Sequence, residues 1–202
     1  NLHLMPKERL RENADKYLEG LGLKDDARRR VGKYSEGMKR RISLIMALVH
    51  DPDIAFLDEP TVAMDPQSRH AVWDFIRGLK ERGRTVILTT HYMEEAAQLC
   101  DRIVILDNGK IVEEGNPRDI VKKHVGKDIL EISYSEEIMS FLKGTYPDAR
   151  EEVGGDKISV VANERERILS DVLERFSPRE SVIRDANLED VFLKLTGRRL
   201  RD

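Results

Sequence analysis

Ile54-Ala55-Phe56-Leu57-Asp58-Glu59-Pro60 is a short apolar run that ends in two adjacent carboxylates. A run of this length, closed at once by polar residues, indicates a buried strand of a parallel sheet. Such a strand would fix Asp58 and Glu59 at the carboxyl edge of the sheet, which is the usual ligand side of an open α/β fold. Asp58 would then hold Mg²⁺, directly or through water, and Glu59 would polarise the water that attacks a γ-phosphate. The alternative is that one of these carboxylates only caps the next helix.

A histidine follows the next predicted strand. Pro66 opens a helix that we expect to run to about Arg82, and Gly83 ends it. The β-branched stretch Thr85–Thr90 then predicts a second buried strand, with His91 at its tip. A histidine in this place can hydrogen-bond a γ-phosphate or orient the attacking water. A structural or surface role is the commoner one for a lone histidine, so both readings stay open.

The segment Gly78-Leu79-Lys80-Glu81-Arg82-Gly83-Arg84-Thr85 has nearly the spacing of a phosphate-binding loop. In G-x-x-x-x-G-K-[ST] loops a strand enters and a helix leaves, because the phosphates bind at the N-terminus of that helix. Here a predicted helix enters and a predicted strand leaves, and Arg84 replaces the lysine. We therefore interpret the segment as a helix end followed by a turn.

The segment Tyr34-Ser35-Glu36-Gly37-Met38-Lys39-Arg40-Arg41 places a hydroxyl and a glycine at a helix start. Free backbone N–H groups and the helix dipole favour an anion at such a start. An ordinary serine cap with a solvated basic turn explains the same residues. The helix is predicted over Glu36–Val49, and the apolar spacing predicts an earlier amphipathic helix over Pro6–Gly20.

The C-terminal part of the chain has a different pattern. After a helix predicted over Tyr92–Leu99, residues Arg102–Glu114 alternate around Asn108-Gly109, the preferred pair for a two-residue hairpin turn. Another helix starts after Gly115-Asn116-Pro117, and we expect a domain boundary near Gly126. Beyond it the order is strand, helix, two strands, helix, strand and helix, which is the split βαβ, ferredoxin-like order with one appended helix. These segments are Ile129–Ser133, Glu136–Leu142, two strands around Gly154-Gly155, Glu164–Phe176, Ser181–Asp185 and Leu188–Leu195.

Composition limits the classes of protein. The 202 residues carry 35 basic and 38 acidic side chains, a net charge of -3. Because no global basic field draws the chain to nucleic acid, we expect no nucleic-acid partner. The longest apolar run, Ile42–Val49, is too short to span a bilayer. Cys100 is the single cysteine, which excludes an internal disulfide and fits a reducing, cytosolic setting.

In their order and spacing these motifs resemble those of the ABC ATPases, the ATP-binding subunits of ABC transporters. The resemblance covers about Asn1 to His124. Its segments are a signature Tyr34-Ser35-Glu36-Gly37-Met38, a Walker B strand ending in Asp58-Glu59, a D-loop Val62-Ala63-Met64-Asp65 and a switch histidine in Thr89-Thr90-His91. The downstream domain, with Leu188-Glu189-Asp190-Val191-Phe192, resembles the C-terminal extension of drug-resistance-type ATPases that serve ABC-2 exporters.

The resemblance implies an α/β fold in two domains. Residues 1–125 would form the C-terminal part of a P-loop NTPase (ABC ATPase) domain. Within it, residues 1–40 would be the helical subdomain with the signature, and residues 41–125 the core from Walker B to the switch histidine, with the hairpin. Residues 126–202 would form a small α+β ferredoxin-like accessory domain.

The resemblance also implies roles for single residues. Glu59 would be the catalytic base, His91 the γ-phosphate switch and Asp58 the magnesium-site carboxylate. In this family two ATPase domains pack head to tail, with ATP in the interface. The segment Ser35-Glu36-Gly37-Met38 would therefore meet ATP held by the other protomer, and Asp65 would act across the same interface.

Departures from the family pattern affect these expectations. Glu36 stands where the family usually has a second glycine, and its carboxylate should weaken the contact with a polyanion unless it points away or meets a basic residue. Met38 replaces the usual glutamine. The phosphate loop, an aromatic that stacks on adenine and the Q-loop glutamine are absent from the 202 residues. We therefore expect a C-terminal fragment that binds ATP poorly and is inactive alone.

The function implied is that of the ATP-binding and ATP-hydrolysing subunit of an ABC-2-type exporter. With ATP and Mg²⁺ as cofactors, closure of the dimer would power a separate integral membrane permease. The protein would then be cytoplasmic and peripheral at the inner face of the cell membrane. One alternative is a non-transport ABC ATPase acting on DNA or ribosomes, against which the near-neutral charge and the compact accessory domain argue. The other is a truncated regulatory module that cannot hydrolyse ATP alone.

Overall fold

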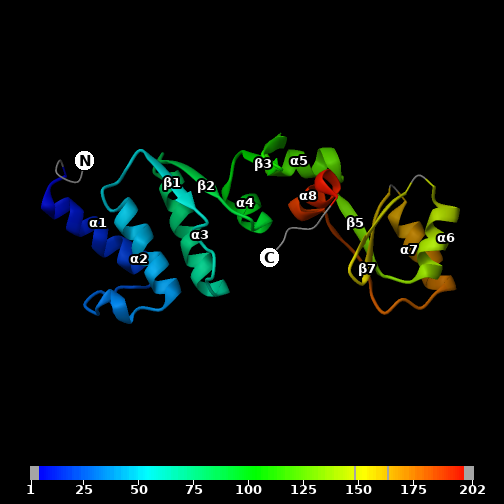
Figure 1. Cartoon of the computed structure of the whole chain (residues 1–202), viewed down its shortest axis with the longest axis horizontal. Coiled ribbons are helices and arrows are strands. Elements are labelled where there is room, and N and C mark those ends of the chain that lie inside the picture. Colours follow the sequence, from blue (N-terminus) through cyan, green and yellow to red (C-terminus); the bar gives the residue numbers. More distant parts are fainter. Residues whose placement is uncertain (1–4, 148, 163, 198–202) are drawn as a thin grey trace. The chain divides into compact units, whose positions relative to one another are not determined.

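The computed structural model of the chain, shown in Figure 1, describes residues 5–147, 149–162 and 164–197. The chain folds into two compact units, Asn1–Glu95 and Ala96–Asp202. Within the described ranges, no helix combines the length and the apolar composition that a membrane crossing requires.

The first unit combines helices with a small parallel sheet. Its elements, in chain order, are α1 (Lys7–Gly20), the 3₁₀ helix η1 (Val31–Lys33), α2 (Glu36–Leu48), β1 (Ile54–Asp58), α3 (Pro66–Glu81), β2 (Thr85–Thr89) and the start of α4 (Met93–Leu99). Ser35 begins α2, because its hydroxyl accepts a hydrogen bond from the backbone N–H of Met38 at 3.2 Å. The two helices predicted before residue 50 are thus confirmed to within one residue at each end.

β1 and β2 pair in parallel, with Asp58 opposite Thr89. α3 makes the crossover between them and contacts β2. It starts where the sequence predicted, with Asp65 as its cap and Pro66 as its first residue. Because the strands run in the same direction, both carboxyl ends lie at one edge of the sheet, as predicted.

The segment with phosphate-loop spacing, Gly78–Thr85, is the end of α3 and the turn into β2. Gly83 has a φ of 77°, a left-handed conformation that glycine adopts without strain. The interpretation as a helix end and a turn is therefore confirmed.

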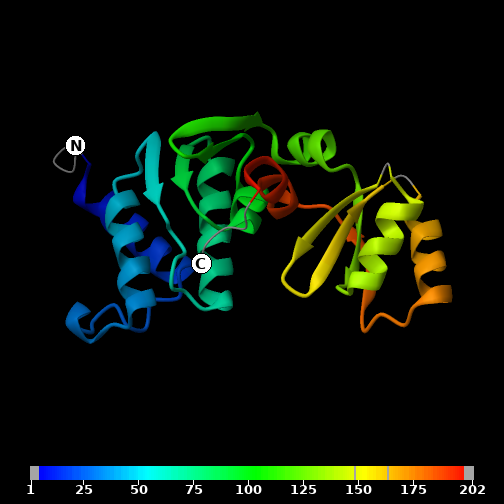
Figure 2. The same ribbon diagram turned by 45° about the vertical axis from the view of Figure 1, so that its right-hand side comes forward.

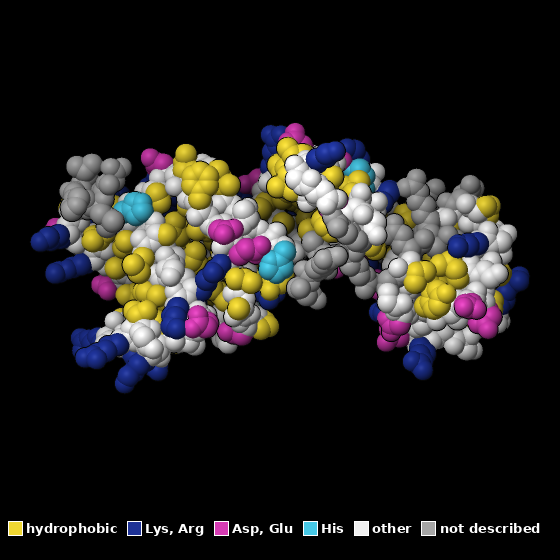
Figure 3. All heavy atoms as spheres, in the orientation of Figure 1, with side chains coloured by type: hydrophobic (Ala, Val, Ile, Leu, Met, Phe, Trp, Pro, Cys, Tyr) yellow, Lys and Arg dark blue, Asp and Glu magenta, His cyan; other side chains and the backbone are white. Residues whose placement is uncertain are grey.

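The prediction that β1 and β2 are buried strands is wrong for one face of the sheet. Ala55 and Leu57 are buried, but Ile54 and Phe56 are 54% and 75% exposed. Ile87 on β2 is 48% exposed. Neighbouring residues of a strand point to opposite faces of the sheet. In the part of the chain that the structure describes, only one face of this two-stranded sheet is covered by other elements. Hydrophobic side chains accordingly gather on the surface of the first unit, as over β1 and α2 in Figure 3.

The second unit starts within α4 and contains a hairpin and a four-stranded sheet. Its other elements are β3 (Ile103–Asp107), β4 (Lys110–Gly115), α5 (Pro117–His124), β5 (Asp128–Ser133), α6 (Glu136–Thr145), β6 (Arg150–Gly154), β7 (Lys157–Val161), α7 (Arg165–Arg175), β8 (Ser181–Asp185) and α8 (Leu188–Thr196). β3 and β4 pair antiparallel. Asn108 and Gly109 have φ values of 49° and 73°, so both central residues of the turn are left-handed, as the Asn-Gly pair predicted.

The four-stranded sheet confirms the ferredoxin-like prediction. Its strand order is β6-β7-β5-β8, and each neighbouring pair is antiparallel. α6 and α7 both lie on one face of this sheet, as Figure 2 shows. The core between helices and sheet consists of Leu130, Ile132, Ile138, Leu142, Ile158, Val160, Ile168 and Val172.

The two compact units divide between Glu95 and Ala96, whereas we expected a domain boundary near Gly126. The hairpin and α5 belong to the second unit, in which α8, the appended helix, contacts α5. Lys194 on α8 also donates a hydrogen bond to the backbone carbonyl of His124 at the end of α5. The domain boundary near Gly126 stays a prediction.

Candidate functional site

Glu59 and His91 lie together at the carboxyl edge of β1 and β2. Nδ1 of His91 is 2.9 Å from Oε2 of Glu59, and the two side chains are 36% and 31% exposed, respectively. Oε2 is enclosed, and no hydrogen bond from a described residue is directed at it. The pair is therefore a close polar approach in which the contacting oxygen is shielded from solvent, although both side chains are partly exposed.

The backbone of Glu59 is held in an unusual conformation. Its φ of 47° is rare for a residue with a side chain and costs about 1–3 kcal/mol, so it persists only where the surroundings hold it. The Glu59 N–H donates to the carbonyl of Thr89 at 3.1 Å. The Thr89 hydroxyl donates to Oδ1 of Asp58. These bonds tie the ends of the two strands together, and they hold the carboxylate of Asp58 and the backbone of Glu59.

Arg40 on α2 makes a link that the sequence analysis missed. Its Nη2 donates to the backbone carbonyls of Asp58 at 2.9 Å and Glu59 at 2.5 Å. The reading of this basic turn as solvated therefore fails for Arg40. No local pattern could have shown the contact, because it depends on how α2 packs beside the end of β1.

The orientation of His91 has its own support. The backbone N–H of Tyr92 donates to the Thr90 hydroxyl at 3.0 Å, which tightens the turn after β2. The His91 and Tyr92 rings lie 4.2 Å apart, and the Arg69 guanidinium of α3 lies 4.5 Å from the centre of the Tyr92 ring. Such a cation over an aromatic face is attracted by the ring. Tyr92 thus packs beside the histidine and Arg69 packs on Tyr92, although neither residue stood out in the sequence.

The segment Ser35-Glu36-Gly37-Met38 forms the first turn of α2. Oε1 of Glu36 pairs with Nζ of Lys39 at 2.6 Å. Lys39 is thus the basic partner that would offset the charge of Glu36. A Cβ added to Gly37 would meet no atom within 4 Å, so the space at this turn is open.

Asp65 caps α3 by accepting a hydrogen bond from the backbone N–H of Ser68 at 2.9 Å. Hydrogen bonds from Ser68 hold the pKa of Asp65 below its ordinary value, so the carboxylate is ionised at neutral pH. The structure thus brings Asp58, Glu59 and His91 together. Ser35 and Asp65 instead stand at the starts of two different helices and make their described hydrogen bonds there.

Asp58 is the residue that could hold a magnesium ion. Mg²⁺ usually takes one or two protein carboxylates and completes its shell with water and substrate phosphates. The residues that the structure describes contain no group of three or more His, Cys, Asp or Glu side chains that could hold a metal. Asp58 is exposed, so its carboxylate could serve as a single protein ligand to a Mg²⁺ ion that arrives with a nucleotide.

Parallel strands that carry carboxylates and a histidine at their carboxyl edge are typical of nucleotide-binding α/β domains, and the comparisons with solved structures support the fold of part of a P-loop nucleoside triphosphatase domain. The sequence pattern described as "ABC transporter" matches residues 2–62. The pattern described as "Nodulation factor export protein NodI, C-terminal domain" matches residues 141–197.

Proteins named "Nod factor export ATP-binding protein I" are similar along most of the chain. The Burkholderia lata protein is 40% identical over 191 residues, which cover 92% of this chain and 60% of the relative. The Rhizobium etli protein is 40% identical over 184 residues, which cover 91% of this chain and 58% of the relative. The chain thus spans about 60% of the length of these curated relatives.

A solved structure titled "Structure of ATP binding subunit of ABC transporter" matches with a TM-score of 0.54 and 26% identity, over 59% of this chain and 50% of that one. Over most of its length the chain is thus similar to ATP-binding proteins of the ABC transporter family.

Proposed function

We propose that this chain supplies the catalytic carboxylate, the switch histidine and the signature helix of an ATP-hydrolysing subunit of an ABC-2-type exporter. The observation that carries the proposal is the 2.9 Å approach of His91 Nδ1 to Glu59 Oε2 at the carboxyl edge of a parallel sheet. A complete site also needs a phosphate-binding loop, which the 202 residues do not contain. We use the term full-length ATPase for a protein that contains both this chain and such a loop.

In this mechanism Glu59 orients the attacking water and takes up its proton. The strand-end bonds to Thr89 and Arg40 hold the backbone of Glu59, so the position from which its carboxylate reaches the water is fixed before the attack. His91 holds the arrangement from the other side: Nδ1 faces Glu59, and we assign the opposite ring nitrogen to the γ-phosphate.

ATP is the substrate, and Mg²⁺ is the metal that we expect beside it. Asp58 would hold the ion, which neutralises charge on the phosphate oxygens when it is bound. The hydrogen bond from Thr89 orients the Asp58 carboxylate.

The first turn of α2 is assigned to ATP held by a second protomer packed head to tail. Free backbone N–H groups at a helix start favour an anion, and the open space at Gly37 lets a phosphate approach the backbone closely. Asp65 would act across the same interface, and Lys39 would neutralise Glu36 there.

The exporter assignment rests on the relatives and on the second unit. Both relatives above are named for export of Nod factor, and the NodI C-terminal pattern covers α7, β8 and α8. We propose that the full-length ATPase lies at the cytoplasmic face of the cell membrane and drives an integral membrane permease. The choice of transported compound then belongs to the permease.

Replacing Glu59 by glutamine tests the proposal in the full-length ATPase. Glu59→Gln should keep ATP binding, give a long-lived ATP-bound dimer and lower kcat by about 10²–10⁴-fold, the usual contribution of a general base. Steady-state hydrolysis and size-exclusion chromatography with Mg-ATP measure these effects. Glu94→Gln, the same change at an exposed position of α4, is the matched control and should leave turnover unchanged. Near-normal turnover of Glu59→Gln would contradict the assignment.

A further inference from the structure

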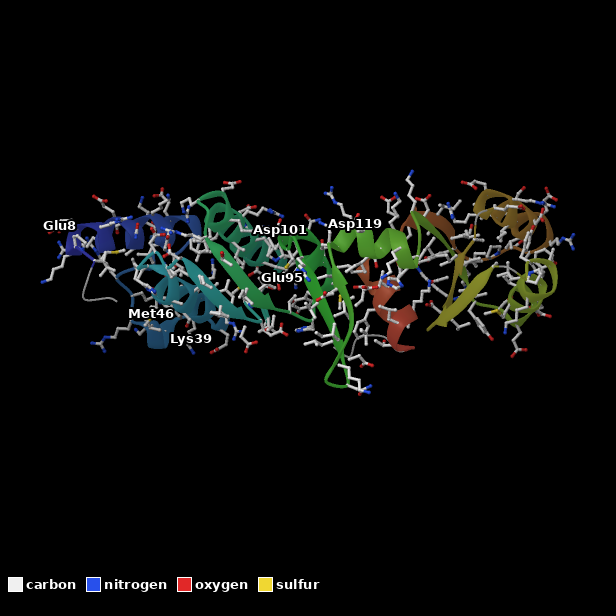
Figure 4. All side chains as sticks on the ribbon, turned by 90° about the horizontal axis from the view of Figure 1, so that it is seen from above. Glu8, Lys39, Met46, Glu95, Asp101 and Asp119 are labelled. Atoms are coloured by element: carbon white, nitrogen blue, oxygen red, sulfur yellow. The ribbon has the colours of Figure 1, made fainter. Side chains whose placement is uncertain are left out.

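A buried carboxylate lies in the first unit apart from the Glu59–His91 pair. Glu95, in the first half of α4, is 0% exposed, as is Thr61 in the loop after β1; among the side chains described they are the two polar ones in the buried class. Oε1 of Glu95 accepts a hydrogen bond from the Thr61 hydroxyl at 2.7 Å and one from Nε1 of Trp73 at 2.9 Å. In Figure 4 Glu95 is labelled among the ribbons, whereas Lys39 lies at the edge of the unit.

These hydrogen bonds join the two segments that carry the reacting groups. Thr61 follows Glu59 by two positions, and Glu95 follows His91 by four. The segments are therefore linked twice: at the surface by the Glu59–His91 approach, and in the interior by the bond from Thr61 to Glu95. Trp73 extends the interior link to α3.

The loop that Thr61 anchors is strained. Glu59 and Ala63, on either side of Thr61, have φ values of 47° and 59°, which are unfavourable for residues with a side chain. The backbone bonds inside the loop are long, at 3.4 Å from Val62 to Glu59 and 3.3 Å from Met64 to Thr61. Strained residues persist only where their surroundings hold them. The buried side-chain bond of Thr61 supplies such a hold.

The chemistry of Glu95 also argues for more than packing. Its second oxygen, Oε2, is buried and accepts no hydrogen bond from a described residue. Burying a carboxylate with incomplete hydrogen bonding is unfavourable, and an apolar side chain could fill a core position without that penalty. A carboxylate here is explained if its oxygen is needed to hold Thr61.

We propose that Glu95 is a positioning residue for ATP hydrolysis. Acting through Thr61, it holds the segment from Glu59 to Asp65 against the turn that carries His91, so that the base and the histidine keep their mutual geometry. The inference rests on the proposed function, because it concerns the same reaction. It adds a buried residue, Glu95, to those that the reaction requires, and the Glu59–His91 pair alone does not show this.

Substitutions in the full-length ATPase separate positioning from simple stabilisation. Thr61→Val keeps the shape of the side chain and removes the hydroxyl; it should lower kcat about 10- to 100-fold while the Kd for ATP stays unchanged, since small misplacements of reacting groups have effects of this size. Glu95→Ala should do the same. Glu95→Gln keeps an acceptor oxygen for Thr61 and Trp73 and should restore kcat to within about threefold of wild type.

Two further measurements complete the experiment. The double variant Thr61→Val/Glu95→Ala should have about the kcat of either single variant, because each change already breaks the same link. Tyr146→Phe removes a hydrogen bond to Asp171 in the second unit and serves as the control; it should leave kcat unchanged. All assays are run well below each variant's Tm, so that loss of folded protein does not enter.

The outcomes distinguish the inference from the proposed function. If Glu59→Gln hydrolyses ATP at the wild-type rate, the proposed function fails. If Glu59→Gln is inactive but Thr61→Val and Glu95→Ala turn over ATP like wild type, the positioning role of Glu95 is wrong. It is equally wrong if Glu95→Gln is as slow as Glu95→Ala, or if the losses multiply in the double variant.

Discussion

At the scale of single residues, Lys39 decides how Glu36 affects the start of α2. The two side chains pair at 2.6 Å, so the glutamate that replaces the family's usual glycine is neutralised within its own helix turn. In the full-length ATPase, Lys39→Met should therefore weaken ATP-driven dimerisation, because it leaves an unpaired carboxylate near a polyanion. The pair is exposed, so we expect a change of about two- to fivefold in the dimer dissociation constant, measured by analytical ultracentrifugation with Mg-ATP.

The matched variants for this prediction are Glu36→Gly and the double variant Glu36→Gly/Lys39→Met. Glu36→Gly should dimerise no more weakly than wild type. The double variant should recover most of what Lys39→Met loses, since the carboxylate is gone. If Lys39→Met has the same effect with and without Glu36, Lys39 acts on the ligand directly and not through Glu36.

Some residues of the candidate site could be predicted from the sequence and others could not. The difference is whether a residue's role depends on its own strand or on contacts with distant segments. Asp58, Glu59 and His91 could be predicted because each follows an apolar strand, and parallel strands end at the same edge of a sheet. Arg40 and Glu95 could not, because their contacts depend on how helices pack against those strand ends. No periodicity or motif in the sequence reports such a contact.

At the scale of secondary-structure elements, Glu113 ties β4 to α5. Its carboxylate accepts hydrogen bonds from Lys123, at 2.7 Å, and from His124. These bonds, that from Lys123 first, lower the pKa of Glu113 from 4.5 to about 2. Because the folded state prefers the ionised form, the resulting stability is fully present above about pH 4.5 and is lost as the pH falls to about 2.

This predicts a pH-dependent effect of Glu113→Gln. The variant should be less stable than wild type above pH 4.5, and the difference should shrink toward zero near pH 2. Urea unfolding at a series of pH values measures it. Glu114→Gln, which removes an exposed pair with Arg102, is the control and should have the smaller effect at neutral pH. A difference for Glu113→Gln that stays constant across this range would contradict the prediction.

Local sequence signals predicted where helices and turns begin, but they did not predict which segments pack against each element. Ser35, Asp65 and the Asn108-Gly109 pair marked their helix starts and hairpin turn correctly, because caps and tight turns are made by neighbouring residues. The apolar composition of β1 predicted burial on both faces, yet Phe56 is largely exposed. A strand's own sequence shows what it can bury but not which segment covers it.

At the scale of the whole molecule, the second unit joins segments that are far apart in the sequence. The ferredoxin-like order was predictable, because each of its strands and helices has its own pattern. The grouping of the hairpin and α5 with the second unit was not, since α5 contacts α8, near the end of the chain, and no local pattern reports that contact. A boundary read from a change of pattern thus need not coincide with a boundary between compact units.

The two compact units should also unfold separately. Leu130 on β5 is 0% exposed in the core of the second unit, and Trp73, the single tryptophan of the chain, is 2% exposed in the first. Leu130→Ala should destabilise the second unit by about 2–5 kcal/mol, the usual range for a buried leucine, and leave the Trp73 fluorescence transition unchanged. Backbone hydrogen exchange in β5 and β7 should become faster, as expected for a less stable second unit.

Leu57→Ala, at a buried position of the first unit, should shift the Trp73 transition and leave exchange in β5 unaltered. A Trp73 midpoint that moves with Leu130→Ala would show instead that the chain unfolds as one cooperative unit.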